Sequence, residues 1–268
     1  MPPCFFNQRL MRTPSSKSNS IICKNCNNNF SGNFCNSCGQ KASVQRIDLN
    51  YVLTEIRQGF LQLDNGLFYT LFKLSHRPGH AVREFLEGRR KNHIKPLSYL
   101  LITSALYVVL TLFAGSETYL GEFFSGMSES LNDRPLTSSV LGWSIQNFAY
   151  VTLLLIPMFS FLSYLLFRRL RYNYFEHLIF NLYITGQVIL IHVISESIHY
   201  TIGLSHYFQK AIPLFAGFFY TFWSYNQFFR KRPLFSVTTR LIFVYLLYAV
   251  SITLIMSIFV VLDIAKGT

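Results

Sequence analysis

The chain has 268 residues, of which 51% are hydrophobic, 17% are aromatic and only 13% are charged. This composition is too apolar and too poor in charge for an ordinary soluble domain, so it predicts a polytopic membrane protein. The formal charge of +12 is high enough for a nucleic-acid-binding protein, but the Lys and Arg residues are concentrated beside apolar segments. Because orientation in a membrane accounts for that distribution, nucleic acid is not expected as a partner.

The N-terminal segment MPPCFFNQRLMRTPSSKSNS is polar and contains no apolar stretch of the length that a cleaved signal peptide needs. We therefore predict a disordered tail over residues 1–20. One of the five cysteines, Cys4, lies in this tail, apart from the other four.

The other four cysteines form two CxxC pairs within CKNCNNNFSGNFCNSCGQK, residues 23–41. Each CxxC turn presents two thiolates from one tight loop, and two such turns complete the tetrahedral ligand set that zinc prefers. The spacing predicts a zinc ribbon over residues 21–42 that binds one structural Zn²⁺ through Cys23, Cys26, Cys35 and Cys38. Because thiolates fill every coordination position, a structural role is favoured over catalysis. Gly39 suits the left-handed backbone that such knuckles use.

Residues 47–94 are predicted to form cytoplasmic amphipathic or interfacial helices. Asp48 is placed to cap the first of these helices, and the DNG turn at 64–66 ends it. Its apolar residues recur at helical spacing: Leu49, Val52, Leu53, Ile56, Phe60 and Leu63.

A second short helix is predicted over 67–75. A third, over 80–94, is basic, and its apolar side fits a helix lying in the headgroup plane. That side consists of Val82, Phe85 and Leu86.

Five apolar runs are each long enough to cross a hydrocarbon core of about 30 Å. They cover about 96–114, 144–167, 175–199, 211–229 and 240–262, within a transmembrane domain of residues 95–268. The predicted fold class is an all-α polytopic membrane protein with five transmembrane helices, preceded by a small Cys4 zinc ribbon and amphipathic helices. Five spans place the two termini on opposite sides of the membrane.

The distribution of basic residues sets the orientation. Segments on the N-terminal side of the membrane hold thirteen of them: Arg77, Arg83, Arg89, Arg90, Lys91, Lys95, Arg168, Arg169, Arg171, Arg230, Lys231, Arg232 and Arg240. The opposite side holds Arg134, Lys210 and Lys266. Because basic loops stay in the cytoplasm, we predict a multi-pass membrane protein with its N-terminus inside and its C-terminus outside.

Three motifs follow one another within residues 23–105: a ribbon ending in CGQK, the segment LDNGLFYTLFKL and the segment RPGHAVREFLEGRRKNHIKPLSYLL. Together they resemble a family of bacterial integral membrane proteins of unknown function with an N-terminal zinc ribbon. The resemblance implies this architecture and a location in a bacterial cytoplasmic (inner) membrane, but no reaction. The first knuckle, CKNCNNNF, departs from the CxxCG form common in such ribbons, and Asn27 can adopt the left-handed geometry in place of glycine.

The RPG motif at 77–79 starts a predicted helix whose first amide groups can hold an anion. The basic residues around it are Arg77, Arg83, Arg89, Arg90 and Lys91. They predict either a site for a phospholipid or polyprenyl phosphate headgroup, or a basic anchor that holds the helix against anionic lipid. The anchor is the favoured interpretation, and both interpretations make a bilayer with anionic headgroups a partner.

Polar residues share one face of the third predicted span: Asn181, Thr185, His192, Glu196 and His199. Polar groups are expensive in hydrocarbon, so this face is expected to point into the helix bundle. His192, Glu196 and His199 also reproduce a Glu-His spacing used in carboxylate metal sites. They can form a second metal site, a proton relay or a headgroup site, or only make interhelical hydrogen bonds. The last interpretation is favoured because no other span offers a matching ligand.

Two classes of function follow. The favoured class is a non-enzymatic scaffold or regulatory membrane protein whose cytoplasmic zinc ribbon recruits a protein partner, and a homo-oligomer is compatible with it. The alternative is a membrane enzyme or transporter that acts on a lipid-linked or ionic substrate through the polar face of the third span. Walker A, GxSxG, HExxH and GxGxxG motifs do not occur in a context that supports them.

Overall fold

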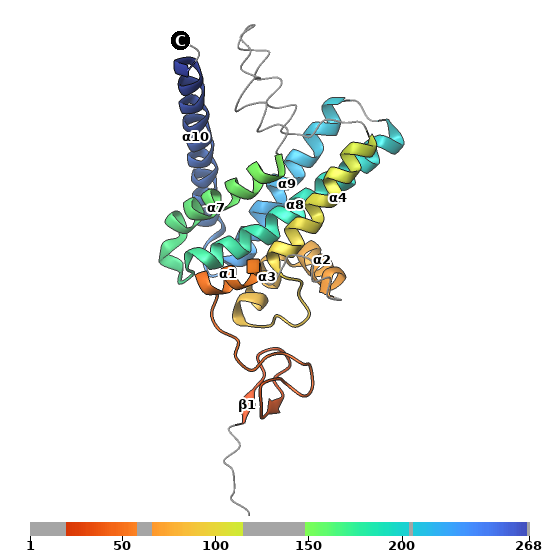
Figure 1. Ribbon diagram of the computed structural model, residues 1–268, viewed down its shortest axis with the longest axis vertical. Coiled ribbons are helices and arrows are strands. Elements are labelled where there is room, and N and C mark those ends of the chain that lie inside the picture. The colour runs from red at the N-terminus through yellow and green to blue at the C-terminus, as the bar shows by residue number, and fades with distance from the viewer. Residues whose placement is uncertain (1–19, 58–65, 115–147, 204–205, 267–268) are drawn as a thin grey trace, which may run out of the picture. The chain divides into compact units, whose positions relative to one another are not determined.

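The computed structural model of this protein describes residues 20–57, 66–114, 148–203 and 206–266 (Figure 1). The chain divides into two compact units, Met1–Val44 and Gln45–Thr268. Nearly all of the predicted disordered tail and the whole segment between the first two predicted spans lie outside the described residues, so these predictions stay untested.

The first unit is a small ribbon. Strands β1 (Ile21–Ile22) and β2 (Asn29–Phe30) pair antiparallel, with Ile21 opposite Phe30. Its buried apolar residues are Cys23, Phe30 and Cys35. Because a core of this size is too small to hold a fold together, the ribbon needs a further source of stability.

The second unit is built from helices. They are α1 (Leu49–Arg57), α2 (Gly66–His76), α3 (Pro78–Glu87), α4 (Pro96–Ala114), α7 (Phe148–Phe167), α8 (Tyr174–Ile202), α9 (His206–Phe228) and α10 (Leu234–Lys266), with the short 3₁₀ helix η2 (Arg168–Leu170) after α7. The five long helices, α4 and α7 to α10, lie where apolar runs predicted them. Asp48 caps α1 as predicted, since its Oδ1 accepts a 2.9 Å hydrogen bond from the backbone N–H of Tyr51.

Helix α3 differs from its prediction in two ways. It ends at Glu87 and does not continue to residue 94, because Gly88 adopts a left-handed φ of 109°. The backbone amides of Gly88 and Arg89 then bond back to the carbonyls of Phe85 and Glu84, which closes the helix end. The apolar face of α3 is also not directed at lipid: Val82 and Phe85 are buried in the core of the second unit.

Three helices are long and apolar enough to cross a membrane, over Pro96–Phe113, Tyr174–Ile202 and Leu234–Ile255. The sequence predicted five spans, so the described residues bear out three candidates only. Polar residues in the second half of α9 lower its mean hydropathy: Thr221, Ser224, Asn226 and Gln227. Most of the large apolar side chains of α10 that the structure describes are exposed, as expected of a helix that faces lipid.

Helix α8 lies at the centre of the bundle and contacts α4, α7 and α9 (Figure 1). It runs parallel to α4, because the ring of Tyr99 meets that of Tyr183 and the ring of Tyr107, further along α4, meets that of His192, further along α8. The hydroxyl of Tyr99 also donates to Gln187 of α8.

The remaining long helices alternate in direction. Helix α9 is antiparallel to α8, since Phe228 meets Phe180 while Gly217 meets Val188. Helix α7 is likewise antiparallel to α8, and α10 is antiparallel to both α7 and α9. Helices α4, α8 and α10 therefore point in one direction, and α7 and α9 point in the other.

Candidate functional site

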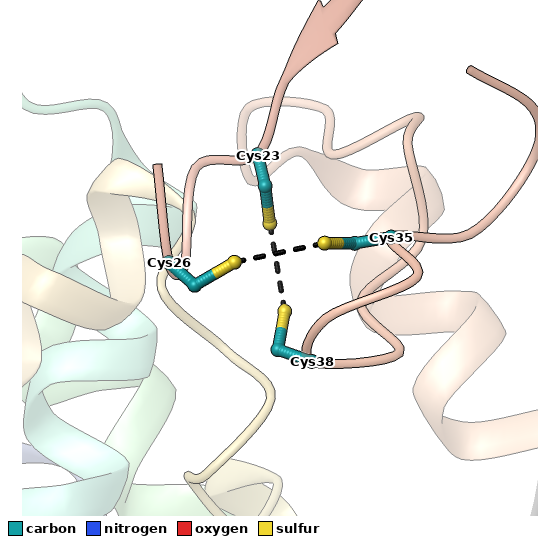
Figure 2. A group of neighbouring side chains, drawn as sticks. All are labelled: Cys23, Cys26, Cys35 and Cys38. Atoms are coloured by element: carbon teal, nitrogen blue, oxygen red, sulfur yellow. Dashed lines mark hydrogen bonds between the residues drawn. The ribbon is translucent and has the colours of Figure 1, made fainter. Parts of the chain in front are cut away.

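The four cysteines of the ribbon converge on one point (Figure 2). The Sγ atoms of Cys23 and Cys38 are 3.5 Å apart, those of Cys26 and Cys35 are 3.6 Å apart, and all four lie within 4.8 Å of one another. Four thiolates at about 2.3 Å from a tetrahedral zinc would be separated by about 3.8 Å. The cluster therefore fits a metal ion of that size, and the predicted ligands are brought together.

The two knuckles hold their cysteines by the same backbone geometry. In the first, the N–H of Asn27 donates to the carbonyl of Cys23 at 2.9 Å; in the second, the N–H of Gly39 donates to the carbonyl of Cys35 at 2.8 Å. Both closing residues are left-handed, with φ of 58° at Asn27 and 72° at Gly39. The left-handed geometry predicted at these two positions is confirmed.

Among the described residues, the four cysteines are the one group of three or more His, Cys, Asp or Glu side chains arranged to hold a metal ion. They are free thiols. His192, Glu196 and His199 do not form such a group, although the Nδ1 atom of His199 is buried without a hydrogen-bond partner in the described part of the chain. Ligand binding by this trio stays a prediction.

A buried polar network joins α7, α8 and α9; the sequence predicted that Asn181 points into the bundle but did not predict its partners. Ser163 Oγ lies 2.9 Å from His177 Nδ1 and 3.0 Å from the hydroxyl of Tyr225. The same hydroxyl donates to Asn181 Oδ1 at 2.8 Å, and Asn181 Nδ2 donates to Ser160 Oγ at 3.0 Å. Since all five side chains are buried, the network acts as an interhelical link. Asn181 lies on the polar face that was expected to point into the bundle, and the two serines of α7 were a further signal in the sequence.

The five basic residues of the predicted anion site do not share one environment: two bond backbone carbonyls and three are exposed. Arg83 donates to the carbonyls of Gln227 and Phe228 at 2.6 and 2.8 Å and so caps the end of α9. Arg90 donates to the carbonyl of Phe85 and lies over the ring of Tyr51. The other three are exposed: Arg77, Arg89 and Lys91.

The N-terminus of α3 does not open to solvent. Pro78 and Gly79 are buried, and a Cβ built at Gly79 would lie 2.3 Å from the backbone nitrogen of Phe228. Because α9 covers this helix end, the structure does not assemble the five basic residues around free amides. Arg77, Arg89 and Lys91 are exposed. A basic anchor requires exposed cations that can reach anionic headgroups, so the anchor interpretation stays compatible with their positions.

An ion pair that was not predicted joins the start of the second unit to α8. Arg46 Nε and Nη2 donate to the two carboxylate oxygens of Glu176 at 2.7 and 2.8 Å, which raises the pKa of Arg46. Glu176 also accepts from the backbone N–H of Asn173, while the Asn173 side chain accepts from the N–H of Glu176. This reciprocal cap was visible in the sequence as an Asn followed three positions later by Glu.

Residues 64–108 match a protein family described as "Protein of unknown function (DUF3667)". The matched segment covers α2, α3 and much of α4, whereas the ribbon lies outside it. No curated protein and no solved structure matches the chain. The family match therefore agrees with part of the resemblance seen in the sequence and assigns no activity.

His93 lies within the matched segment and is predicted to make stability depend on pH. Burial, with a smaller effect from the charge of Lys73, lowers the pKa of His93 to about 4. Its Nε2 atom has no hydrogen-bond partner in the described residues, and the rings of Tyr69 and Phe85 stand edge-on to it. In the unfolded chain the pKa of His93 is about 6.5. As the pH falls, the unfolded chain therefore binds a proton at His93 at a higher pH than the folded protein does.

The stabilising effect of neutral His93 is complete above about pH 6.5 and is lost as the pH falls toward about 4. We expect the free energy of unfolding to drop by about 2 kcal/mol between about pH 7 and pH 5. Thermal unfolding in detergent at several pH values measures this, with His93→Leu as the comparison. Equal losses in the wild type and in His93→Leu would assign the pH dependence to other groups.

Proposed function

We propose that this protein is a non-enzymatic scaffold of the bacterial inner membrane, in which a cytoplasmic ribbon with one structural zinc ion recruits a protein partner to a five-helix bundle. The observation that carries the proposal is the closed cluster of four cysteines. With four protein ligands, a zinc ion there has no position for a substrate, and its effect is to stabilise the ribbon.

The directions of the helices support five spans over three. The three candidate spans, α4, α8 and α10, are parallel to one another. If each crosses the membrane, the chain must return between them, and the antiparallel α7 and α9 are the helices placed to do so. The basic residues at the α7–α8 and α9–α10 turns then lie on the same side as those before α4, which supports a cytoplasmic N-terminus.

The surface of the ribbon supports a protein partner. Ile22 and Phe34 have exposed fractions of 65% and 56%, although the ribbon is short and its own apolar core is small. Large apolar side chains that stay exposed on so small a unit favour binding to another protein. Lys24 and Lys41 on the same unit are exposed and offer amines for cross-linking.

The test is quantitative cross-linking in cells, with identification of proteins linked to Lys24 or Lys41. We expect a specific partner to be linked to the wild type and lost from Ile22→Ser/Phe34→Ser, because the docking side chains are removed while the metal ligands remain. Phe68→Ser is the matched control, since Phe68 is 81% exposed but lies on α2. Cross-links that persist in the ribbon variant, or that disappear equally in the control, would contradict the proposal.

The alternative function, a membrane enzyme or transporter, depends on His192, Glu196 and His199. One observation favours it: the buried Nδ1 of His199 has no hydrogen-bond partner in the described residues. It requires that His192→Ala/Glu196→Ala abolish function while the protein remains folded. An unchanged phenotype in that variant would exclude it.

A further inference from the structure

A pocket of about 370 Å³ lies between α3 and the turns that join α7 to α8 and α9 to α10. We call it the turn pocket. Basic side chains from the two turns line it: Arg171, Arg230, Lys231 and Arg232. Its volume is in the range of small-ligand sites. The second unit contains all of its lining residues, so the pocket is a feature of this unit alone.

Among the described residues, the four turn cations of the pocket have no ion-pair partner. None of them has a carboxylate within ion-pair distance there, and the ion pairs found are Arg46–Glu176 and Arg89–Glu87. Glu87 is the only acidic residue in the lining, and it pairs with Arg89 outside the pocket. A concentration of like charge at a concave surface attracts anions.

Neighbouring groups show the effect of this charge. Burial and then the charges of Arg83, Arg230 and Arg77 lower the pKa of His80. Burial and then the charge of Arg230 likewise lower the pKa of Arg83. Arg83 bonds the last carbonyls of α9, so the partial negative charge of that helix end is neutralised beside the pocket.

The rest of the lining of the turn pocket is largely apolar. Leu170, Phe228 and Phe229 line it together with Tyr172, whose ring lies 4.6 Å from that of Phe228. Cations beside an apolar and aromatic surface suit a phosphate group attached to an apolar body. Arginine is suited to phosphate because its guanidinium binds two phosphate oxygens at once.

We propose that the turn pocket binds a phosphate-bearing anion, either the headgroup of a phosphorylated lipid or a soluble pyrophosphate. The site differs from the one predicted around the start of α3, because Arg77, Arg89, Arg90 and Lys91 do not line it and only Arg83 is shared. It does not depend on the ribbon or on a protein partner.

The experiment uses the full chain in nanodiscs of neutral lipid. One arm titrates pyrophosphate by calorimetry, and the other includes phosphatidic acid and measures retained lipid by native mass spectrometry. We expect the wild type to bind in at least one arm. Arg230→Gln/Arg232→Gln should weaken that binding by about tenfold or more, since each removes a charge-assisted contact. The arm that responds identifies the source of the phosphate.

Arg168→Gln/Arg169→Gln is the matched control. It also removes two exposed charges from the same side, but neither residue lines the pocket. We expect the control to bind as the wild type does. Equal weakening in both variants would show that the anion binds to the basic surface in general and not to the pocket. Absence of binding by the wild type in both arms would overturn the proposal.

If Arg230→Gln/Arg232→Gln does not fold, Lys231→Gln alone replaces it as the test variant, with a smaller expected loss of binding. Binding that survives in Ile22→Ser/Phe34→Ser keeps this test separate from the docking proposal.

Discussion

Replacing Cys35 and Cys38 with serine is expected to remove the metal and unfold the ribbon while the helical unit stays folded. The ribbon buries few apolar side chains, so it depends on the bonds between metal and thiolates. In small zinc domains the metal contributes about 10 kcal/mol or more of folding free energy. The two units are separately compact, which is why the helical unit should survive.

Elemental analysis of protein purified in mild detergent measures the effect. We expect one zinc ion per wild-type chain and none in the variant, together with rapid proteolysis between residues 20 and 44. Cys4→Ser is the control, because Cys4 lies outside both CxxC pairs in the sequence, and it should keep its zinc. Metal that remains in a folded Cys35→Ser/Cys38→Ser variant and disappears on adding His192→Ala would reveal a second centre on α8. That result would favour the enzyme or transporter.

Gly79→Ala is expected to destabilise the helical unit by about 3 kcal/mol or more, because overpacking against a backbone cannot be relieved by a side-chain rotation. A Cβ at Gly79 would lie 2.3 Å from the nitrogen of Phe228 and 2.7 Å from the carbonyl carbon of Gln227. To make room, α3 must move away from the end of α9. That movement breaks the hydrogen bonds from Arg83 to the carbonyls of both residues.

Thermal unfolding in detergent compares Gly79→Ala with Gly217→Ala. Both glycines lie in helices at close contacts, but the atom nearest to a Cβ at Gly217 is the Cγ1 of Val188, at 3.0 Å. That side chain can shift, so the control should lose much less stability. Equal unfolding temperatures for the two variants would show that α3 does not pack on the end of α9 as described.

The metal cluster was predictable from sequence because its determinants are local. Two CxxC turns, each closed by a residue that tolerates the left-handed conformation, bring their sulfurs together over a few residues. Asn27 and Gly39 take that conformation. The positions of the long helices were predictable for a similar reason, since an apolar run of about 20 residues is a property of consecutive positions.

Tertiary contacts alone decided the surroundings of α3 and the polar links of the bundle. Val82 and Phe85 have the spacing of a lipid-facing stripe, but both are buried in the core, where the ring of Phe85 meets those of Tyr51 and Tyr183. Arg83 has the charge of an anion ligand, and it caps a helix that lies more than a hundred residues further along the chain.

The turn pocket likewise collects its charges from two turns far apart in the sequence and from α3. The sequence determined which residues carry charge, which runs are helical and which four thiols form a cluster able to hold a metal ion. Which charges meet each other, and which meet a backbone carbonyl, depends on helix packing. Packing is set by contacts between distant segments, and no local pattern in the sequence encodes them.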